Sequence, residues 1–397
     1  MTEPLPQSPA PAEFERERHA TNLELFLDLV FVFAVTQLAG FLSADLTWSG
    51  LGRGLLIGWL VWWLWSQFTW LGTAIDLEQR SVTQLLVLAA VPPTLLMAVS
   101  LPTAYTTSGL QFAGAYMAVQ LWALAIMGWG VWGDPSTRKA WLSFAPLAAL
   151  APTLLVVGAL FDGRARVAVW AVVAIFDVGA ALLGGRPTSS GTAAWRIEPA
   201  HFAERHSLFV IISLGEVLVA AGATATGSPL TASIGVGLVT AVSVACVLWW
   251  TYFAFVPRVT EAALTRVEGS ERGRAARNLF TFGHFPVVIG IVLYAVVAKH
   301  LVSNPLETMH AADLAVLTGA VTFFIGGLLG MQWQIVHRLA PERLAVIIMT
   351  GAWCAIAGAH LDAVVIVAGV AAMLLVMQAI TLRRFNRADT SAATDPK

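Results

Sequence analysis

Long apolar segments separated by short polar connections occupy most of this chain, and their lengths predict helices that cross a membrane. A helix needs about 20 predominantly apolar residues to span the hydrocarbon core of a bilayer. After a polar stretch at 1–22, the pattern predicts twelve spans: 23–42, 54–75, 82–101, 110–132, 141–160, 165–183, 203–223, 231–256, 278–299, 312–332, 344–360 and 363–382. We therefore predict an all-α, polytopic integral membrane protein.

The composition supports this class and excludes several others. Of the 397 residues, 57% are hydrophobic and only 12% are charged, and the mean hydropathy is +0.74, whereas soluble domains carry about 25% charged residues. The net charge of −1 gives no basic surface for nucleic acid. Cys246 and Cys354 lie in separate apolar segments, which predicts neither a disulfide framework nor a zinc cluster.

No short motif of an enzyme accompanies the apolar segments. The sequence contains no GxxxxGK[ST] phosphate loop, no HExxH metal motif and no GxSxG nucleophile elbow, and each of these motifs would bring a specific chemistry. We expect no enzyme activity, no cofactor and no bound metal. The expected partners are the lipid bilayer and a small solute or ion.

The positions of lysine and arginine predict the orientation, because cytoplasmic connections are enriched in both. Placing the N-terminus inside leaves Arg53, Arg164, Arg166 and Lys299 outside, while Arg205 opens a span and the rest of the 23 basic residues lie inside. The N-terminal 22 residues lack the apolar core of a cleaved signal peptide. We therefore predict an inner-membrane protein with both termini in the cytoplasm.

Short similarities between the two halves of the chain suggest an internal duplication. GALFD at 158–162 corresponds to GAHLD at 358–362, WSQF at 65–68 to WTYF at 250–253, and Pro92 to Pro286. The predicted organisation is a polar tail at 1–22, six-helix repeats at 23–183 and 203–382, a linker at 184–202 and a basic tail at 383–397. An even number of spans per unit makes the repeats parallel, an arrangement found in some transporters.

Ionisable side chains inside predicted spans are costly in a bilayer and usually mark a pathway or a relay. Glu24 and Asp28 are four residues apart and share one helical face. Glu24 fits a capping box with Thr21, which is a structural role. Asp28 lies a turn deeper, so its carboxylate should be paired with a cation or carry a proton; pathway and structural roles both remain open for it.

The seventh span places Arg205, Ser213 and Glu216 on one face together with His201. Glu216 lies near the middle of the span, and Gly215 beside it should allow a close helix approach. Arg205 is about 16 Å from Glu216 along the axis, so the two cannot touch. We expect Arg205 to pair with Asp28 or Glu24 and Glu216 to be the protonatable or cation-coordinating group.

Two further buried candidates have a structural alternative of equal or greater weight. Asp177 lies in the middle of the sixth span among small residues, where a protonated acid could bond a neighbouring helix. His284 precedes Pro286, and a carbonyl freed by that proline could accept a hydrogen bond from its ring. The dense tryptophans at 59–65 are expected to form a packing surface or, alternatively, an aromatic pathway wall.

ELFLDLVFVFAV at 24–35 and ERHSLFVIISLGEVLVA at 204–220 resemble the bacterial low temperature requirement A family. Glu24, Phe26 and Asp28 match its pattern, whereas Leu27 replaces a usual aromatic residue. Glu204, Arg205, Gly215 and Glu216 also match, and Val217 takes a place often held by serine. The resemblance implies a multi-pass bacterial inner-membrane protein and leaves its molecular activity open.

The function we favour from the sequence is secondary transport of a small solute or ion, coupled to protons. Glu216 and Asp28 would carry or coordinate the cation, and Arg205 would set their charge state. A passive ion channel on the same scaffold is one alternative. Phe26-Leu27-Asp28 is faintly similar to the Phe-Ser-Asp helix of two-repeat potassium channels, but Ser213-Leu214-Gly215-Glu216 in the second half departs from it, so the similarity does not carry this alternative. The second alternative is a membrane factor for cold adaptation that transports nothing.

Overall fold

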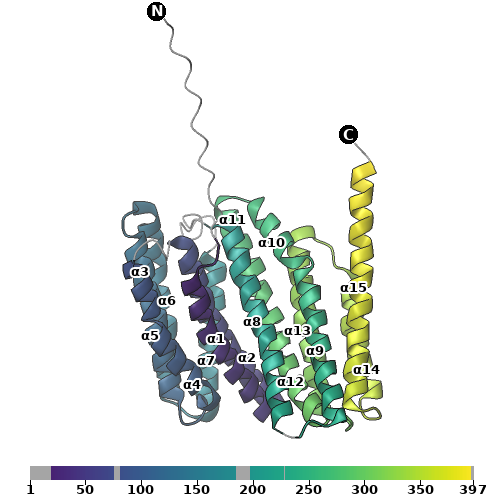
Figure 1. The fold of residues 1–397 in the computed structure, drawn as a ribbon. Coiled ribbons are helices and arrows are strands. Elements are labelled where there is room, and N and C mark those ends of the chain that lie inside the picture. Colours follow the sequence, from purple (N-terminus) through teal and green to yellow (C-terminus); the bar gives the residue numbers. More distant parts are fainter. Residues whose placement is uncertain (1–18, 76–80, 185–196, 228, 395–397) are drawn as a thin grey trace, which may run out of the picture.

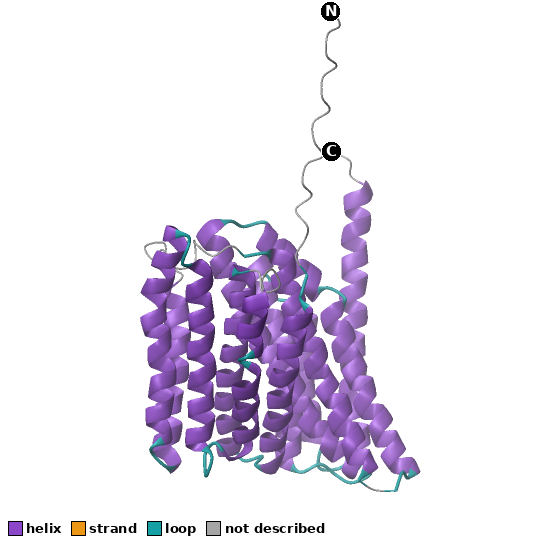
Figure 2. Cartoon of the chain, turned by 60° about the vertical axis from the view of Figure 1, so that its left-hand side comes forward, coloured by secondary structure: helices purple, strands orange, loops and turns teal. Residues whose placement is uncertain are grey.

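The computed structural model describes residues 19–75, 81–184, 197–227 and 229–394, which form a bundle of long helices without a β-strand in this part of the chain (Figures 1 and 2). Most of the predicted N-terminal tail and of the 184–202 linker lies outside these residues. The helices are α1 Asn22–Ala44, α2 Trp48–Ala74, α3 Ser81–Leu88, α4 Val91–Ser100, α5 Gly109–Val131, α6 Pro135–Ala159, α7 Gly163–Gly184, α8 Pro199–Thr226, α9 Ala232–Phe253, α10 Val256–Thr265, α11 Gly269–Ala275, α12 Gly283–Ser303, α13 Ala311–Val336, α14 Pro341–Ala357 and α15 Ala363–Thr394, with a 3₁₀ turn η1 Leu101–Thr103 and a π-helix η2 Ala276–Phe282.

Ten helical segments of the described chain are long and apolar enough to cross a membrane. They correspond to ten of the twelve predicted spans and confirm an all-helical protein with many candidate membrane helices. The remaining two predicted spans are also helices, α2 and α14. α14 has only 17 residues, and the tryptophans and polar residues of α2 lower its mean hydropathy.

Two of the predicted spans are interrupted, and proline explains both breaks. The predicted helix at 82–101 is divided into α3 and α4, because Pro92 and Pro93 at the start of α4 have no N–H to donate to the preceding turn. Similarly, α9 ends at Phe253, and α10 begins as a separate helix at Val256, with Pro257 in its first turn. At the C-terminus the helix continues to Thr394 rather than ending at 382, since no glycine or proline lies between 370 and 394 to stop it.

Side chains at the helix ends satisfy backbone groups that have no partner within the helix. Thr21 forms the predicted capping box with Glu24 at the start of α1. Thr47, Asp134 and Thr231 accept hydrogen bonds from the first turns of α2, α6 and α9, respectively. These polar caps mark where the sequence changes from connection to span.

The helices from α1 to α7 lie on one side of the bundle and those from α8 to α15 on the other (Figure 1). α12 is the central helix of the second group, since 78% of its most apolar 18-residue stretch is buried, compared with 22% for α7. α1 packs against both α8 and α12. The two groups of helices therefore meet along α1, α8 and α12.

A very close approach of two helices occurs at Gly290 of α12. A Cβ atom at this position would lie 2.5 Å from the backbone nitrogen of Phe324 and 2.7 Å from the oxygen of Ala320, both on α13. Gly215, for which the sequence predicted such a contact, has no atom within 4 Å of a Cβ. The prediction for Gly215 is therefore wrong, because its side of α8 faces open space rather than another backbone.

Candidate functional site

The first turns of α1 and α8 begin at the same end of the bundle, and the two helices run side by side in the same direction (Figure 1). Glu204 of α8 accepts a hydrogen bond from the backbone N–H of Ala20, 2.7 Å away, just before α1 begins. This contact fixes the relative register of the two helices. Polar residues of α1 and α8 consequently face each other at three successive positions along the two helices, which we call levels.

Asp28 and Arg205 form a bidentate ion pair at the second of these levels. Nη1 and Nη2 of Arg205 donate to Oδ2 and Oδ1 of Asp28, each at 2.9 Å, and neither side chain is exposed. The indole Nε1 of Trp65 on α2 donates a third hydrogen bond to Asp28 Oδ1 at 2.8 Å. The predicted pairing of Arg205 with Asp28 is confirmed, and Trp65 is an additional partner.

Glu24 forms the first level, one turn before Asp28. Its Oε2 lies 3.1 Å from His201 Nε2 and accepts the backbone N–H of Thr21 at 3.0 Å, while its Oε1 is 3.7 Å from Arg205 Nε. The capping role and the contact with Arg205 that were predicted for Glu24 are both present. The guanidinium of Arg205 thus lies between two carboxylates of α1.

Glu216 forms the third level, where it contacts Thr36 of α1. Thr36 is eight residues after Asp28, which is about 12 Å along the helix axis at 1.5 Å per residue. The hydroxyl of Thr36 donates a hydrogen bond to Glu216 Oε2. The Glu216 side chain is only 3% exposed. Lys299 of α12 interacts with it through its charge but forms no ion pair with it among the described residues. The carboxyl group of Glu216 is therefore buried with a hydroxyl as its hydrogen-bond partner.

Four buried polar atoms around the first two levels lack a hydrogen-bond partner among the described residues. They are Glu24 Oε1, Arg205 Nε, His201 Nδ1 and His206 Nε2. Buried polar atoms are almost always hydrogen-bonded to protein or to water. Glu24 Oε1 and Arg205 Nε are 3.7 Å apart and so attract each other through charge. A buried water would complete the hydrogen bonds of the remaining atoms.

His284 lies behind α8, on α12. Its Nδ1 is 3.0 Å from the backbone oxygen of Leu279. The predicted acceptor was a carbonyl freed by Pro286, which would lie about four residues before that proline, so Leu279 is a different carbonyl and the predicted partner is wrong. Since Nδ1 must be the donor to the Leu279 oxygen, Nε2 accepts from the hydroxyl of Tyr252 at 2.8 Å. The rings of His206 and His284 are 5.1 Å apart. These contacts link η2 and α12 with α8 and α9.

The other predicted site residues lie apart from these contacts. The hydroxyl of Ser213 donates to the oxygen of Phe209 in its own helix. Asp177 is buried on α7, and no recorded bond of the described residues connects it with Glu24, Asp28 or Glu216. The structure therefore groups Glu24, Asp28, Arg205 and Glu216 along α1 and α8 and leaves Asp177 in a different part of the bundle.

Three residues that take part in these contacts were not predicted from the sequence: Thr36, His206 and Tyr252. Thr36 is eight residues after Asp28 and so shares its helical face, which is a signal that could have identified it. Tyr252 lies within the WTYF segment that resembles WSQF. Among the described residues, no group of three His, Cys, Asp or Glu side chains could hold a metal ion.

Comparison with known proteins identifies the family of this chain. The family model of the bacterial low temperature requirement A protein (LtrA) matches residues 19–379. Uncharacterized protein RA0937 of Rhizobium meliloti (strain 1021) is 31% identical over 333 residues, which cover 80% of this chain and 78% of that protein. The family match at residues 19–379 includes α1, α8 and the site residues Glu24, Asp28, Arg205 and Glu216.

Proposed function

Because this chain belongs to the bacterial low temperature requirement A family, we propose that it is a multi-pass inner-membrane protein that transports a small solute or ion by coupling to protons. The single observation that carries the proposal is the carboxyl group of Glu216. It is buried within a membrane helix and is hydrogen-bonded to a hydroxyl, while Lys299 acts on it through its charge without forming an ion pair among the described residues. An ionisable group at such a depth is a functional candidate.

Glu216 is suited to gain and lose a proton because its partner tolerates both states. The hydroxyl of Thr36 can donate to a carboxylate and can accept from a carboxylic acid. Asp28, in contrast, is bound by Arg205 and Trp65 through three hydrogen bonds. In our proposal Glu216 carries the proton, and the Asp28–Arg205 pair holds α1 and α8 in register.

The solute would enter the polar region between α1 and α8. The atoms of Glu24, Arg205 and His201 that lack a hydrogen bond among the described residues would provide acceptors and donors at its inner end, and Glu216 lies farther along the same helices. A polar path bounded by two helices from different groups fits alternating access, in which one group of helices moves against the other.

Two recurring helix contacts support two parallel repeats. α1 packs against α2 and α4 as α8 packs against α9 and α12, and α6 packs against α7 as α14 packs against α15. GALFD and GAHLD both lie where the members of the latter pairs are joined. We propose that the repeats begin at α1 and α8 and that both termini are cytoplasmic, as the arginine distribution predicts.

The test is a flux measurement in liposomes with an enclosed pH dye. Purified wild-type protein and the Glu216→Gln variant are given outward gradients of K⁺, Na⁺ or Mg²⁺, one at a time, with the membrane potential clamped. The wild type should move protons in response to at least one gradient. Glu216→Gln should abolish this movement, because the amide cannot exchange a proton, and the variant should still fold.

Glu268→Gln is the matched control, since Glu268 is an exposed acid outside the site. Unchanged proton movement in Glu216→Gln would remove Glu216 from the mechanism. Ion flux that follows the membrane potential and needs no proton movement would identify a channel instead. Absence of any flux in the wild type would contradict the transport proposal.

A further inference from the structure

A cavity of about 290 Å³ lies away from the α1–α8 site, between α10, α13, α14 and α15. Its lining includes α10 and the first residues of α14, and α10 lies at the end of the bundle from which α15 projects (Figure 1). Val256, Leu328 and Met331 form its buried floor, and Val259 and Val336 on its rim are 40% and 51% exposed. The cavity thus opens at the surface of the helix bundle.

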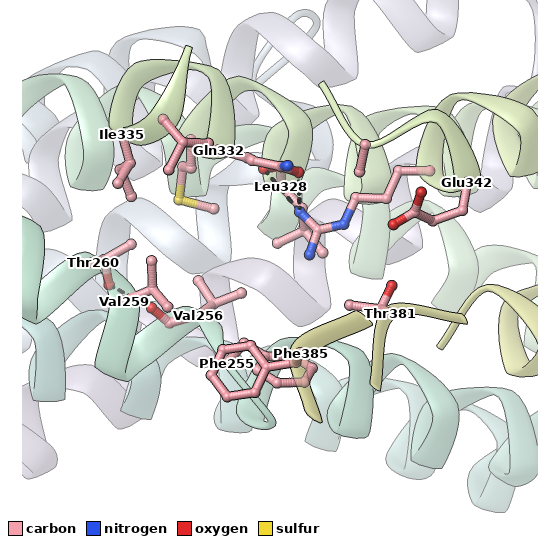
Figure 3. Close-up of a pocket in the computed structure, with 14 residues that line it drawn as sticks. Phe255, Val256, Val259, Thr260, Leu328, Gln332, Ile335, Glu342, Thr381 and Phe385 are labelled. Atoms are coloured by element: carbon pink, nitrogen blue, oxygen red, sulfur yellow. Dashed lines mark hydrogen bonds between the residues drawn. The ribbon is translucent and has the colours of Figure 1, made fainter. Parts of the chain in front are cut away.

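The lining of the cavity is mostly apolar. Phe255 and Phe385 contact each other on one side with their ring centres 4.9 Å apart, and Gln332 lies on the opposite side (Figure 3). A space of this volume could hold about ten water molecules at about 30 Å³ each, but apolar cavities stay dry and accept apolar molecules. The shape and chemistry therefore suit a hydrocarbon chain.

Charged side chains lie at one side of the mostly apolar cavity: Arg343 and Glu342 line it, and Arg384 pairs with Glu342, which leaves one net positive charge. Arg343 lines the cavity, and its Nη1 donates to Gln332 Oε1 at 3.1 Å and to the oxygen of Leu328 at 3.3 Å. Among the described residues no carboxylate lies within ion-pair distance of Arg343. The neighbouring Glu342 interacts with Arg343 through its charge and is itself paired with Arg384 at 2.6 Å, so two arginines share one carboxylate.

The remaining guanidinium nitrogens of Arg343, Nε and Nη2, have no recorded partner in the described part of the chain and can donate to an anion. Guanidinium groups bind phosphate through parallel hydrogen bonds. Basic pockets between membrane helices near the cytoplasmic surface bind anionic lipid headgroups. An apolar space beside this arginine therefore matches both parts of such a lipid.

We propose that this cavity binds an anionic phospholipid, with one acyl chain among the apolar side chains and the phosphate against Arg343. The inference goes beyond the transport proposal and does not depend on it. It assigns α13–α15 a role in lipid recognition at the end of the bundle that is rich in arginine.

Native mass spectrometry of the full-length, delipidated protein tests this site. Dioleoyl phosphatidylglycerol and dioleoyl phosphatidylcholine have the same acyl chains and differ in net charge, and sn-glycerol 3-phosphate supplies the phosphate without a chain. The wild type should bind the anionic lipid more tightly than the zwitterionic one. Glycerol phosphate should not compete, since it cannot fill the apolar cavity.

Arg343→Gln should weaken binding of phosphatidylglycerol about fivefold, the equivalent of one arginine near an anionic headgroup, and Arg343→Lys should retain the preference. Ala340→Phe, at a buried lining position, should reduce binding of both lipids by filling the space. Arg266→Gln, an exposed arginine outside the lining, should change nothing. Equal binding of both lipids by the wild type, an unchanged preference in Arg343→Gln, or competition by glycerol phosphate would overturn the proposal.

Discussion

Replacing Arg205 by glutamine should destabilise the protein more than replacing Asp28 by asparagine, although the two side chains form one ion pair. Arg205 lies between two carboxylates, with Asp28 at 2.9 Å and Glu24 at 3.7 Å. Without Arg205 both carboxylates remain buried, four residues apart on α1, with no arginine between them. Without the Asp28 charge, Arg205 still has Glu24 as a counter-ion.

The expected magnitudes follow from this asymmetry. Removing one partner of a buried ion pair costs about 3–5 kcal/mol because the other charge is left uncompensated, and Arg205→Gln should lie in the upper part of this range. Asp28→Asn should cost about 1.5–3 kcal/mol, the value of hydrogen bonds to a charged group. In the double variant the two amides can hydrogen-bond, so its cost should fall short of the sum by about 2–3 kcal/mol.

The measurement is the apparent free energy of unfolding of the purified protein, from equilibrium titration of detergent micelles with sodium dodecyl sulfate. Tryptophan fluorescence reports unfolding, because the chain has 16 tryptophans. Wild type, both single variants and the double variant form one cycle. Equal costs for the two single changes, or strict additivity in the double variant, would refute a coupled pair with Glu24 as the reserve counter-ion.

Two further predictions concern the scaffold. Gly290→Ala should lower the free energy of unfolding by about 1–3 kcal/mol through overpacking, because the new Cβ would meet the α13 backbone. Gly326→Ala is the control, since a Cβ there would have nothing within 4 Å. Equal effects of the two changes in the same titration would contradict the close approach of α12 and α13. Hydrogen bonds from Ser136 and Thr137 lower the pKa of Asp134 from 3.8 to about 2, so the α6 cap should be complete above pH 3.8 and lost as the pH falls through about 2. Hydrogen exchange of the first turn of α6 should show this loss, and its persistence in Asp134→Asn would identify another cause.

The sequence predicted the features that one helix carries by itself. Hydrophobic length located the spans, and the i, i+4 spacing placed Glu24 and Asp28 on one face. The Arg205–Asp28 pair was also predictable, because a buried charge requires a partner and few were available. Family resemblance through Glu24–Val35 and Glu204–Ala220 was confirmed across residues 19–379.

Contacts that depend on tertiary packing could not be read in the same way. Nothing in the sequence around Thr36 indicates its contact with Glu216, because this bond depends on how α8 packs against α1. The oxygen of Leu279 that His284 contacts belongs to the backbone, so no side-chain pattern marks it. The misassigned Gly215 shows the same limit, since a small residue permits a close approach but does not specify the helix that makes it.

The π-helix η2 has a consequence for how the two groups of helices can move. Trp62 of α2 donates its indole hydrogen to the backbone oxygen of Thr281 at 2.7 Å, and Trp70 donates to the Thr281 hydroxyl at 3.2 Å. The π-helix thus accepts hydrogen bonds from two tryptophans of α2, which belongs to the other group of helices. A movement of one group of helices against the other would break these two hydrogen bonds unless Thr281 kept its place relative to α2, so the π-helix is a point where such a movement would be resisted.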